Sequence, residues 1–113
     1  MLRTALVIAA LAGAIPQAAM AEWRYCLAPS DKEHKVYLSS AFATTADAWS
    51  TDNSFEKVLE RDHLQFDDVQ CPRADDEGSI IAMLQHAVGY NREIGRKIVF
   101  VQWQPALVDR RRN

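Results

Sequence analysis

Glycine and histidine are both scarce in this sequence, which has 4 glycines and 3 histidines among its 113 residues. It contains no glycine-rich phosphate loop, no nucleophile elbow and no closely spaced cysteine and histidine residues. These are the commonest sequence signatures of nucleotide-binding enzymes, α/β-hydrolases and zinc proteins. We therefore expect a protein that is not an enzyme and that binds no metal and no cofactor.

Positive charge is not in excess either. The chain has 13 Lys and Arg against 15 Asp and Glu, a formal net charge of −2. A nucleic-acid-binding protein needs a basic face that displaces counterions from phosphate, so this class is disfavoured. The acids concentrate between residues 60 and 77, where seven acidic residues stand against Arg61 and Arg73. A region of this kind attracts a basic partner.

Long hydrophobic runs are also absent. The longest, Ala5–Ile15, has about eleven residues, whereas a membrane-spanning helix needs about twenty. Arg3 precedes this run, and the small residues Ala19 and Ala21 follow it, which is the arrangement of a secretory signal peptide. We predict a signal peptide over residues 1–21, cleavage after Ala21, export to the periplasm and no stable membrane insertion afterwards. An uncleaved amphipathic anchor is the alternative, but the segment has no polar face.

The chain has only two cysteines, Cys26 and Cys71. In an exported chain the natural prediction is a disulfide between them. The bridge closes a loop of about 45 residues, for which the chain-entropy estimate is about 4 kcal/mol of stabilisation. A metal site and a catalytic thiol are the alternatives, and both lack the partner spacing that they need.

The first half of the exported chain predicts a hairpin and a short helix. Apolar and polar residues alternate over residues 23–28 and again over 35–40, with polar turn residues between them, which is typical of two antiparallel strands. We expect residues 41–53 to be an irregular crossing segment with one helical turn. Ser54 can cap a helix over residues 55–62, whose apolar residues fall on one face.

The second half predicts a strand, a long helix and a last strand. Residues 64–71 indicate a short strand with a bulge, which Pro72 ends. Asp75 or Asp76 can cap a helix that runs to about Arg92 or Ile94, and Gly95 stops it. Residues 98–103 are almost wholly apolar, as expected of a central strand that is covered on both faces.

These elements predict one α+β domain over residues 22–105, in the order β-β-α-β-α-β. We expect one antiparallel or mixed sheet of about four strands, two helices on one of its faces and one disulfide. Residues 106–113, which include three consecutive arginines, are predicted to be a flexible basic tail.

Few residues suggest chemistry. The acidic pairs 67–68 and 75–76 are better explained by strand alternation and by the helix dipole than by catalysis. His86 is a boundary residue of the long helix, and the adjacent Ser39 and Ser40 have no identifiable base. The candidates for partner binding are one arginine and three acids near the disulfide: Arg73, Asp67, Asp68 and Asp75. Arginine is a frequent anchor residue of interfaces, although Arg73 can also simply neutralise the nearby acids.

Several segments together resemble a known family. They are the strand with Tyr25 and Cys26, the stretch Val69–Arg73, the pair Asn91 and Arg92, and the final strand after Gly95. In this combination the chain resembles small periplasmic proteins of Gram-negative bacteria that inhibit lysozyme-like peptidoglycan hydrolases. The resemblance implies that it binds a muramidase or a lytic transglycosylase and limits cell-wall cleavage.

The better-known lysozyme inhibitors are all-β barrels with a Ser-Gly-rich inhibitory loop, which this sequence lacks. Their inhibitory residues therefore cannot be carried over to any position here. Two other classes stay open: a small periplasmic structural or ligand-binding protein of the cell envelope without catalytic activity, and a small enzyme whose site is assembled from scattered residues.

Overall fold

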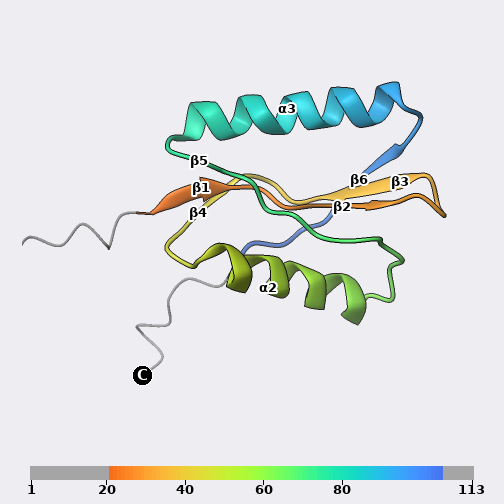
Figure 1. Ribbon diagram of the computed structural model, residues 1–113, viewed down its shortest axis with the longest axis horizontal. Coiled ribbons are helices and arrows are strands. Elements are labelled where there is room, and N and C mark those ends of the chain that lie inside the picture. Colours follow the sequence, from red (N-terminus) through yellow and green to blue (C-terminus); the bar gives the residue numbers. More distant parts are fainter. Residues whose placement is uncertain (1–20, 106–113) are drawn as a thin grey trace, which may run out of the picture.

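The computed structural model describes residues 21–105. Most of the predicted signal peptide and the predicted basic tail lie outside these residues. The described elements, in chain order, are β1 (Glu22–Arg24), β2 (Leu27–Ser30), β3 (Lys35–Leu38), β4 (Phe42–Thr44), α2 (Ala48–Arg61), β5 (Arg73–Ala74), α3 (Glu77–Glu93) and β6 (Lys97–Phe100). Figure 1 shows their arrangement, with the strands between the two helices. The predicted α+β class is confirmed.

The predicted hairpin is the centre of the fold, and a bulge bends it. Leu27 pairs with Leu38, but Arg24 pairs with Phe42, so two residues of one strand face three of the other. Ser39 fills the irregular step, because its hydroxyl accepts from the Cys26 N–H at 2.9 Å and donates to the Ser40 carbonyl at 2.9 Å. The bulge divides the predicted single sheet into two three-stranded sheets, β4-β1-β5 and β2-β3-β6, which share the long hairpin.

The predicted strand 64–71 is largely a loop, and its pairing begins later. Gln70 pairs with Leu27, and Arg73 pairs with Arg24 in the same antiparallel register. Pro72 does not end the strand as predicted, since β5 follows it. It faces Tyr25 in this register and has no N–H to donate, which explains why the pairing is interrupted there.

This register also explains the disulfide. It places Cys26 directly opposite Cys71 on adjacent strands, at a Cα–Cα distance of 4.0 Å, and the two sulfurs are bonded. The predicted bridge is therefore confirmed. Because the bridge lies between neighbouring strands, it fastens segment 67–74 to the hairpin. Cys26 is fully buried and Cys71 nearly so.

Helix α2 is longer than predicted. It begins at Ala48, with Asp47 as N-cap accepting from the Ser50 N–H at 2.7 Å, and it passes through Ser54, the predicted cap. The extra turns form because Thr51 is buried and donates to the Asp47 carbonyl at 2.9 Å. Tertiary packing thus overrides the weak helix propensity of the Ser, Thr, Asp and Asn residues in this segment.

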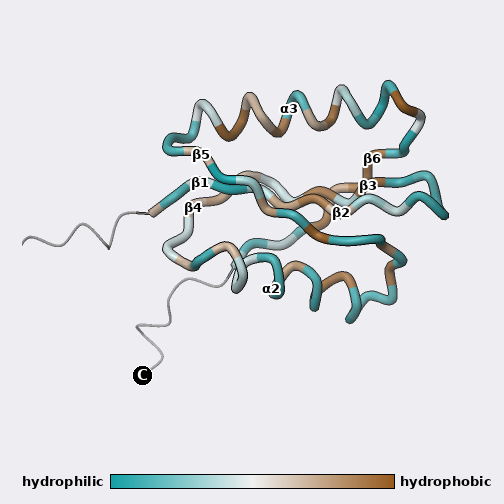
Figure 2. Tube along the Cα trace, viewed as in Figure 1, coloured by the Kyte–Doolittle hydropathy of each residue, from teal (hydrophilic) through white to brown (hydrophobic). Residues whose placement is uncertain are grey.

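Helix α3 agrees with its prediction. Asp76 is the N-cap and accepts from the Ser79 N–H at 2.8 Å. Gly95 follows the helix with a φ of 87°, a conformation that glycine adopts without steric cost. Hydrophobic residues recur along all of α3 (Figure 2), yet only Ile80, Ala87 and Asn91 are buried in it.

The two helices pack on opposite faces of the strands, so the prediction of two helices on one face is wrong. Val36 and Leu38 contribute to a core with Ile80 of α3, whereas Tyr37, between them, belongs to a core with Phe55 of α2. Alternate residues of a strand point to opposite faces, and each face therefore has its own helix. Among residues 21–105, no helix is both long and apolar enough to cross a membrane.

The last strand is shorter than predicted and lies in a different place. β6 ends at Phe100 and pairs in parallel with β3 at the outside of its sheet, not at the centre. Its apolar sequence reflects the two helices above and below it: Ile98 contacts the α3 core and Val99 the α2 core. Trp103 continues on the α2 side, with its ring 5.1 Å from that of Phe55.

Candidate functional site

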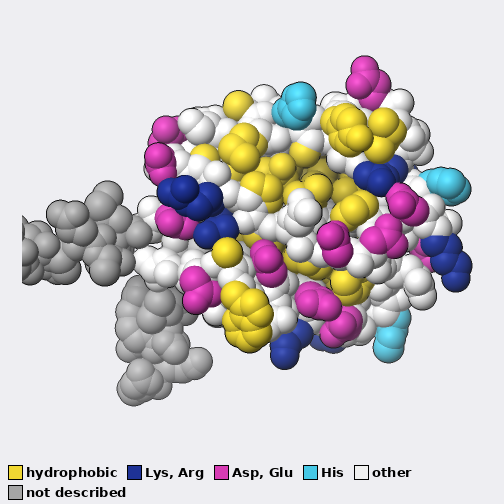
Figure 3. Space-filling view, in the orientation of Figure 1, with side chains coloured by type: hydrophobic (Ala, Val, Ile, Leu, Met, Phe, Trp, Pro, Cys, Tyr) yellow, Lys and Arg dark blue, Asp and Glu magenta, His cyan; other side chains and the backbone are white. Residues whose placement is uncertain are grey.

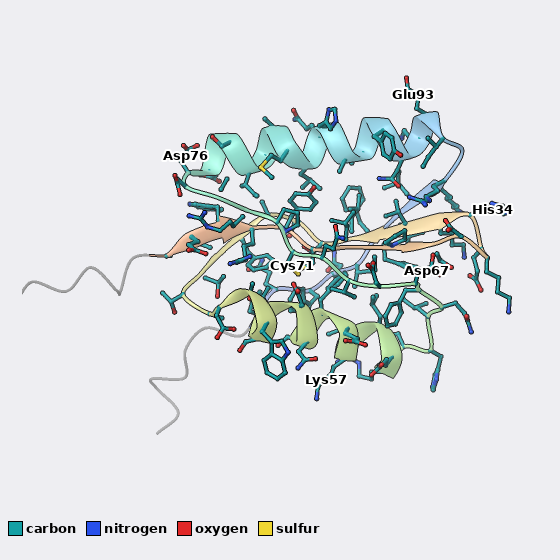
Figure 4. The ribbon with its side chains drawn as sticks, in the orientation of Figure 1. His34, Lys57, Asp67, Cys71, Asp76 and Glu93 are labelled. Atoms are coloured by element: carbon teal, nitrogen blue, oxygen red, sulfur yellow. A yellow bond between two sulfur atoms is a disulfide. The ribbon has the colours of Figure 1, made fainter. Side chains whose placement is uncertain are left out.

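The candidate site is the segment 62–77, which runs along the outer side of β1 and β2. We call it the acidic edge. It carries six acids against the single base Arg73, a local formal charge of −5. In Figure 3 acidic side chains are spread over this face of the molecule, with basic and hydrophobic side chains between them. In Figure 4 the labelled Asp67 and Asp76 lie toward opposite ends of this segment, with Cys71 between them.

Several backbone bonds hold the acidic edge against the hairpin. Leu27 and Gln70 exchange both of their N–H to carbonyl bonds, at 2.8 and 3.0 Å. The Asp67 N–H donates to the Pro29 carbonyl at 2.8 Å. Together with the disulfide, these bonds fix the segment from residue 67 to residue 74. Its side chains are therefore presented by a rigid backbone.

A buried arginine fastens the middle of the acidic edge. Arg24 is only 5% exposed, and its Nη1 donates to the Cys71 carbonyl at 2.7 Å. Its Nη2 donates to Glu22 at 3.0 Å, whereas its Nε has no hydrogen-bond partner among residues 21–105. Because a buried charge is costly unless it is bonded, Arg24 holds Cys71 firmly in place.

Asp52 of α2 belongs to the same buried cluster. Its Oδ1 is buried without a hydrogen-bond partner in the described chain. Burial raises the pKa of Asp52, and the charge of Arg24 and the backbone N–H of Cys71 partly offset this rise. The cluster thus connects α2, β1 and the acidic edge at one point.

Sequence reasoning missed this cluster. The alternation of residues 23–28 already places Arg24 on the same face as Cys26 and Ala28, and both of these are fully buried. An arginine on the buried face of a strand is an unusual feature, since arginine is almost never buried without a partner. This arginine on the buried face of the strand is the sequence feature from which the cluster could have been predicted.

The four predicted partner-binding residues all lie on the acidic edge, in two groups. Arg73 and Asp75 are together, with Nη2 of Arg73 at 2.8 Å from Oδ1 of Asp75. Asp67 and Asp68 lie nearer the hairpin turn, where Asp67 accepts from the Asp31 N–H at 3.0 Å. Asp67 and Arg73 are six positions apart along the chain, or about 20 Å.

The side chain of Arg73 is 51% exposed, and it sits between two carboxylates. Besides Asp75, its Nε lies 3.3 Å from Oε2 of Glu22. Glu22 also bonds the buried Arg24, so the exposed and the buried guanidinium share one carboxylate. This arrangement orients Arg73 at the surface and leaves half of its side chain accessible.

The positions of the other residues considered from the sequence are explained by the fold. Hydrogen bonds from Ser79 lower the pKa of Asp76, which is consistent with its role as the cap of α3. Ser39 is fully buried in the bulge, and His86 is exposed on α3. Within residues 21–105, no three or more His, Cys, Asp or Glu residues are grouped as metal ligands would be.

Searches of protein-family models, curated proteins and solved structures find no significant match to this chain.

Proposed function

We propose that this protein is exported to the periplasm, where it binds and inhibits a lysozyme-like peptidoglycan hydrolase through its acidic edge and so limits cell-wall cleavage. The partner is a muramidase or a lytic transglycosylase. The observation that carries the proposal is a surface segment, residues 62–77, with a formal charge of −5, whose central part from residue 67 to residue 74 is held in place by a disulfide and the buried Arg24.

Electrostatics supports a basic partner. Lysozyme-like enzymes are commonly basic around their glycan cleft, and an acidic surface is steered toward such a cleft from a distance. Rigidity supports binding as well, because a segment that is already ordered loses little conformational entropy when the partner arrives. Asp67 and Asp68 supply the attraction at one end of the acidic edge, and Arg73 supplies a contact at the other.

Arg73 is the residue that we assign to the cleft itself. Its bonds with Glu22 and Asp75 are exposed, and exposed ion pairs of this kind are worth only about 0–1 kcal/mol. Exchanging one of them for a catalytic carboxylate of the enzyme therefore costs little. In a cleft that excludes water, the new charge-assisted bond is stronger than the one it replaces.

The test is a turbidity assay of peptidoglycan lysis, with the protein in molar excess over lysozyme and over the host's own muramidase. We expect slower lysis, and we expect Arg73→Ala to weaken inhibition mainly through faster dissociation. The double variant Asp67→Asn/Asp68→Asn should slow association and flatten its salt dependence. A matched control, Glu56→Gln/Glu93→Gln, removes the same charge from the two helices and should leave association unchanged.

Undiminished lysis by both enzymes would contradict the proposal and favour a structural or ligand-binding protein of the envelope. Export is tested separately, by N-terminal sequencing of the protein from the periplasmic fraction. The expected first residue is Glu22. An intact Met1 on a membrane-bound form would contradict the predicted cleavage after Ala21.

A further inference from the structure

The outer side of β6 is an open sheet edge, and it adjoins an apolar groove. β6 is the last strand of the sheet β2-β3-β6 in the described chain. Lys97 and Val101 donate their N–H groups to His34 and Leu38 on the β3 side. Since these bonds alternate along a strand, the N–H and carbonyl groups of Ile98 and Phe100 point to the open side. We call this side of β6 the open edge.

The groove lies between the open edge and α3. It has a volume of about 450 Å³, and its lining is mostly hydrophobic, with Ile81, Leu84, Val88 and Phe100 as its large apolar members. Phe100 is 57% exposed and Ile81 is 39% exposed. Helix α3 therefore has two apolar faces. One packs on the strands, and the other is turned to the same side as the outward backbone groups of β6.

We propose that the open edge and this groove form a homodimer interface, in which β6 of two copies pair in antiparallel orientation about a two-fold axis at Val99. In this register Ile98 of each copy faces Phe100 of the other, and both outward-pointing residues exchange hydrogen bonds. A two-fold interface must complement itself. This one does so, because each copy offers one β-branched and one aromatic residue to the same cross-strand pair.

The size of the surface is sufficient for a second copy. Helix α3 has 17 residues and is therefore about 25 Å long. The helix and the strand layer below it together are about 20 Å high. Two such surfaces bury on the order of 1,000 Å², which meets the lower limit for a specific interface.

The charge of β6 does not oppose this pairing. Lys97 is the exposed charged residue of β6, and in the proposed register it faces Val101 of the other copy. The two Lys97 residues are then four positions apart, or about 13 Å, which is beyond the Debye length of about 8 Å at physiological salt. The acidic edge lies at the opposite side of the sheets and stays accessible in the dimer.

Sedimentation velocity of the protein from about 1 to 200 μM tests the interface. We expect a reversible monomer–dimer equilibrium, and we expect Phe100→Glu to weaken it at least tenfold, since the interface contains two copies of that residue. Trp49→Glu is the matched control: Trp49 is exposed on α2, away from the open edge, and this variant should dimerise normally. Circular dichroism and thermal unfolding establish that both variants are folded.

The register has its own test in engineered cysteines. Val99→Cys should form an intermolecular disulfide on a non-reducing gel, because two facing residues at the axis are as close as Cys26 and Cys71 are within one copy. Val101→Cys, on the same face of the strand, should not, since its two copies are about 13 Å apart. A protein that is monomeric throughout the concentration range, or a dimer that Phe100→Glu leaves unchanged, would overturn the proposal.

Discussion

Segment 67–74 and β6 lie at opposite sides of the strand layer, and their backbone groups have different surroundings. In segment 67–74, the Cys71 carbonyl accepts a bond from Arg24 at 2.7 Å. In β6, the outward groups of Ile98 and Phe100 meet no such side chain among the described residues. Prolines, bulges and charges are the usual means by which a protein prevents strand addition at an edge.

The difference indicates that the two edges offer different things to a partner. The acidic edge offers charged side chains on a backbone whose Cys71 carbonyl is already bonded to Arg24. The open edge offers backbone groups and apolar side chains, with Lys97 as its main protecting charge. A partner of the first edge is selected by charge, and a partner of the second by strand pairing and shape. A change at one edge should therefore leave the other edge unaffected.

The largest effect is expected from removing the disulfide. Cys26→Ala/Cys71→Ala should lower the free energy of unfolding by about 2–5 kcal/mol, because segment 67–74 loses the bond that fastens it to the hairpin. Urea unfolding measures the loss. Amide hydrogen exchange should increase along the acidic edge and stay unchanged in β6.

The wild-type protein after reduction is the control, and it should reproduce the behaviour of the double variant. Two free thiols in the native protein, detected by alkylation and mass spectrometry, would contradict the bridge. An equal increase in amide hydrogen exchange at both edges would show that the disulfide stabilises the fold as a whole. The two edges would then not differ in this respect.

The second effect is expected from Arg24. Arg24→Met keeps much of the packing but removes the bond to the Cys71 carbonyl and the positive charge beside Asp52. Loss of a buried, bonded charge predicts a destabilisation of about 2–4 kcal/mol. The double variant Arg24→Met/Asp52→Asn should recover part of this loss. Urea unfolding of Arg24→Met, Asp52→Asn and the double variant, compared with the unchanged protein, forms a double-mutant cycle. A strictly additive result would mean that Arg24 and Asp52 do not act together.

The sequence predicts well those features of the fold that local signals determine. Helix α3 has an acidic cap at Asp76, an apolar period and a stop at Gly95, and all three are found in the structure. Helix α2 has an equally good cap at Asp47, but the residues after it are weak helix formers, so the sequence does not predict the first two turns. Those turns form because Thr51 and Phe55 become buried, which is a property of the assembled core.

The strand order and the buried cluster depend on contacts distant in sequence. The apolar residues of β6 are compatible with a central strand and also with an outer strand between two helices, and only the topology decides between them. The link between Arg24 and Cys71 spans 47 residues. The charge of the acidic edge was evident from composition, whereas its rigidity was evident only in part, through the two cysteines.

A smaller effect is expected at the turn that leads into the open edge. Gly95 has a φ of 87°, and no atom of residues 21–105 lies within 4 Å of the position that a Cβ would take, so Gly95→Ala introduces backbone strain alone. We expect a loss of about 1–2 kcal/mol in the free energy of unfolding. Gly89→Ala in α3 is the control, because its position is also open and helical, and there alanine should stabilise slightly. If the two edges are independent, Gly95→Ala weakens dimerisation and leaves binding at the acidic edge unchanged.

The smallest effect concerns the pH dependence of stability, through Asp52 of α2. Burial raises the pKa of Asp52 above that of an unfolded aspartate, so the folded state binds more protons than the unfolded state between the two values. Asp52 therefore costs stability at neutral pH, and this cost disappears as the pH falls below the ordinary aspartate range. Asp52→Asn should raise the urea midpoint at pH 7 and leave it unchanged near pH 3. Asp47 is the matched control on the same helix: hydrogen bonds from Ser50 lower its pKa, so it contributes stability above the ordinary aspartate range that is lost as the pH falls through its lowered pKa. Asp47→Asn should therefore lower the midpoint more at pH 7 than near pH 3. A lower midpoint for Asp52→Asn at pH 7 would mean that the attraction of Arg24 outweighs burial, and that the cluster beneath the acidic edge is held by an ion pair.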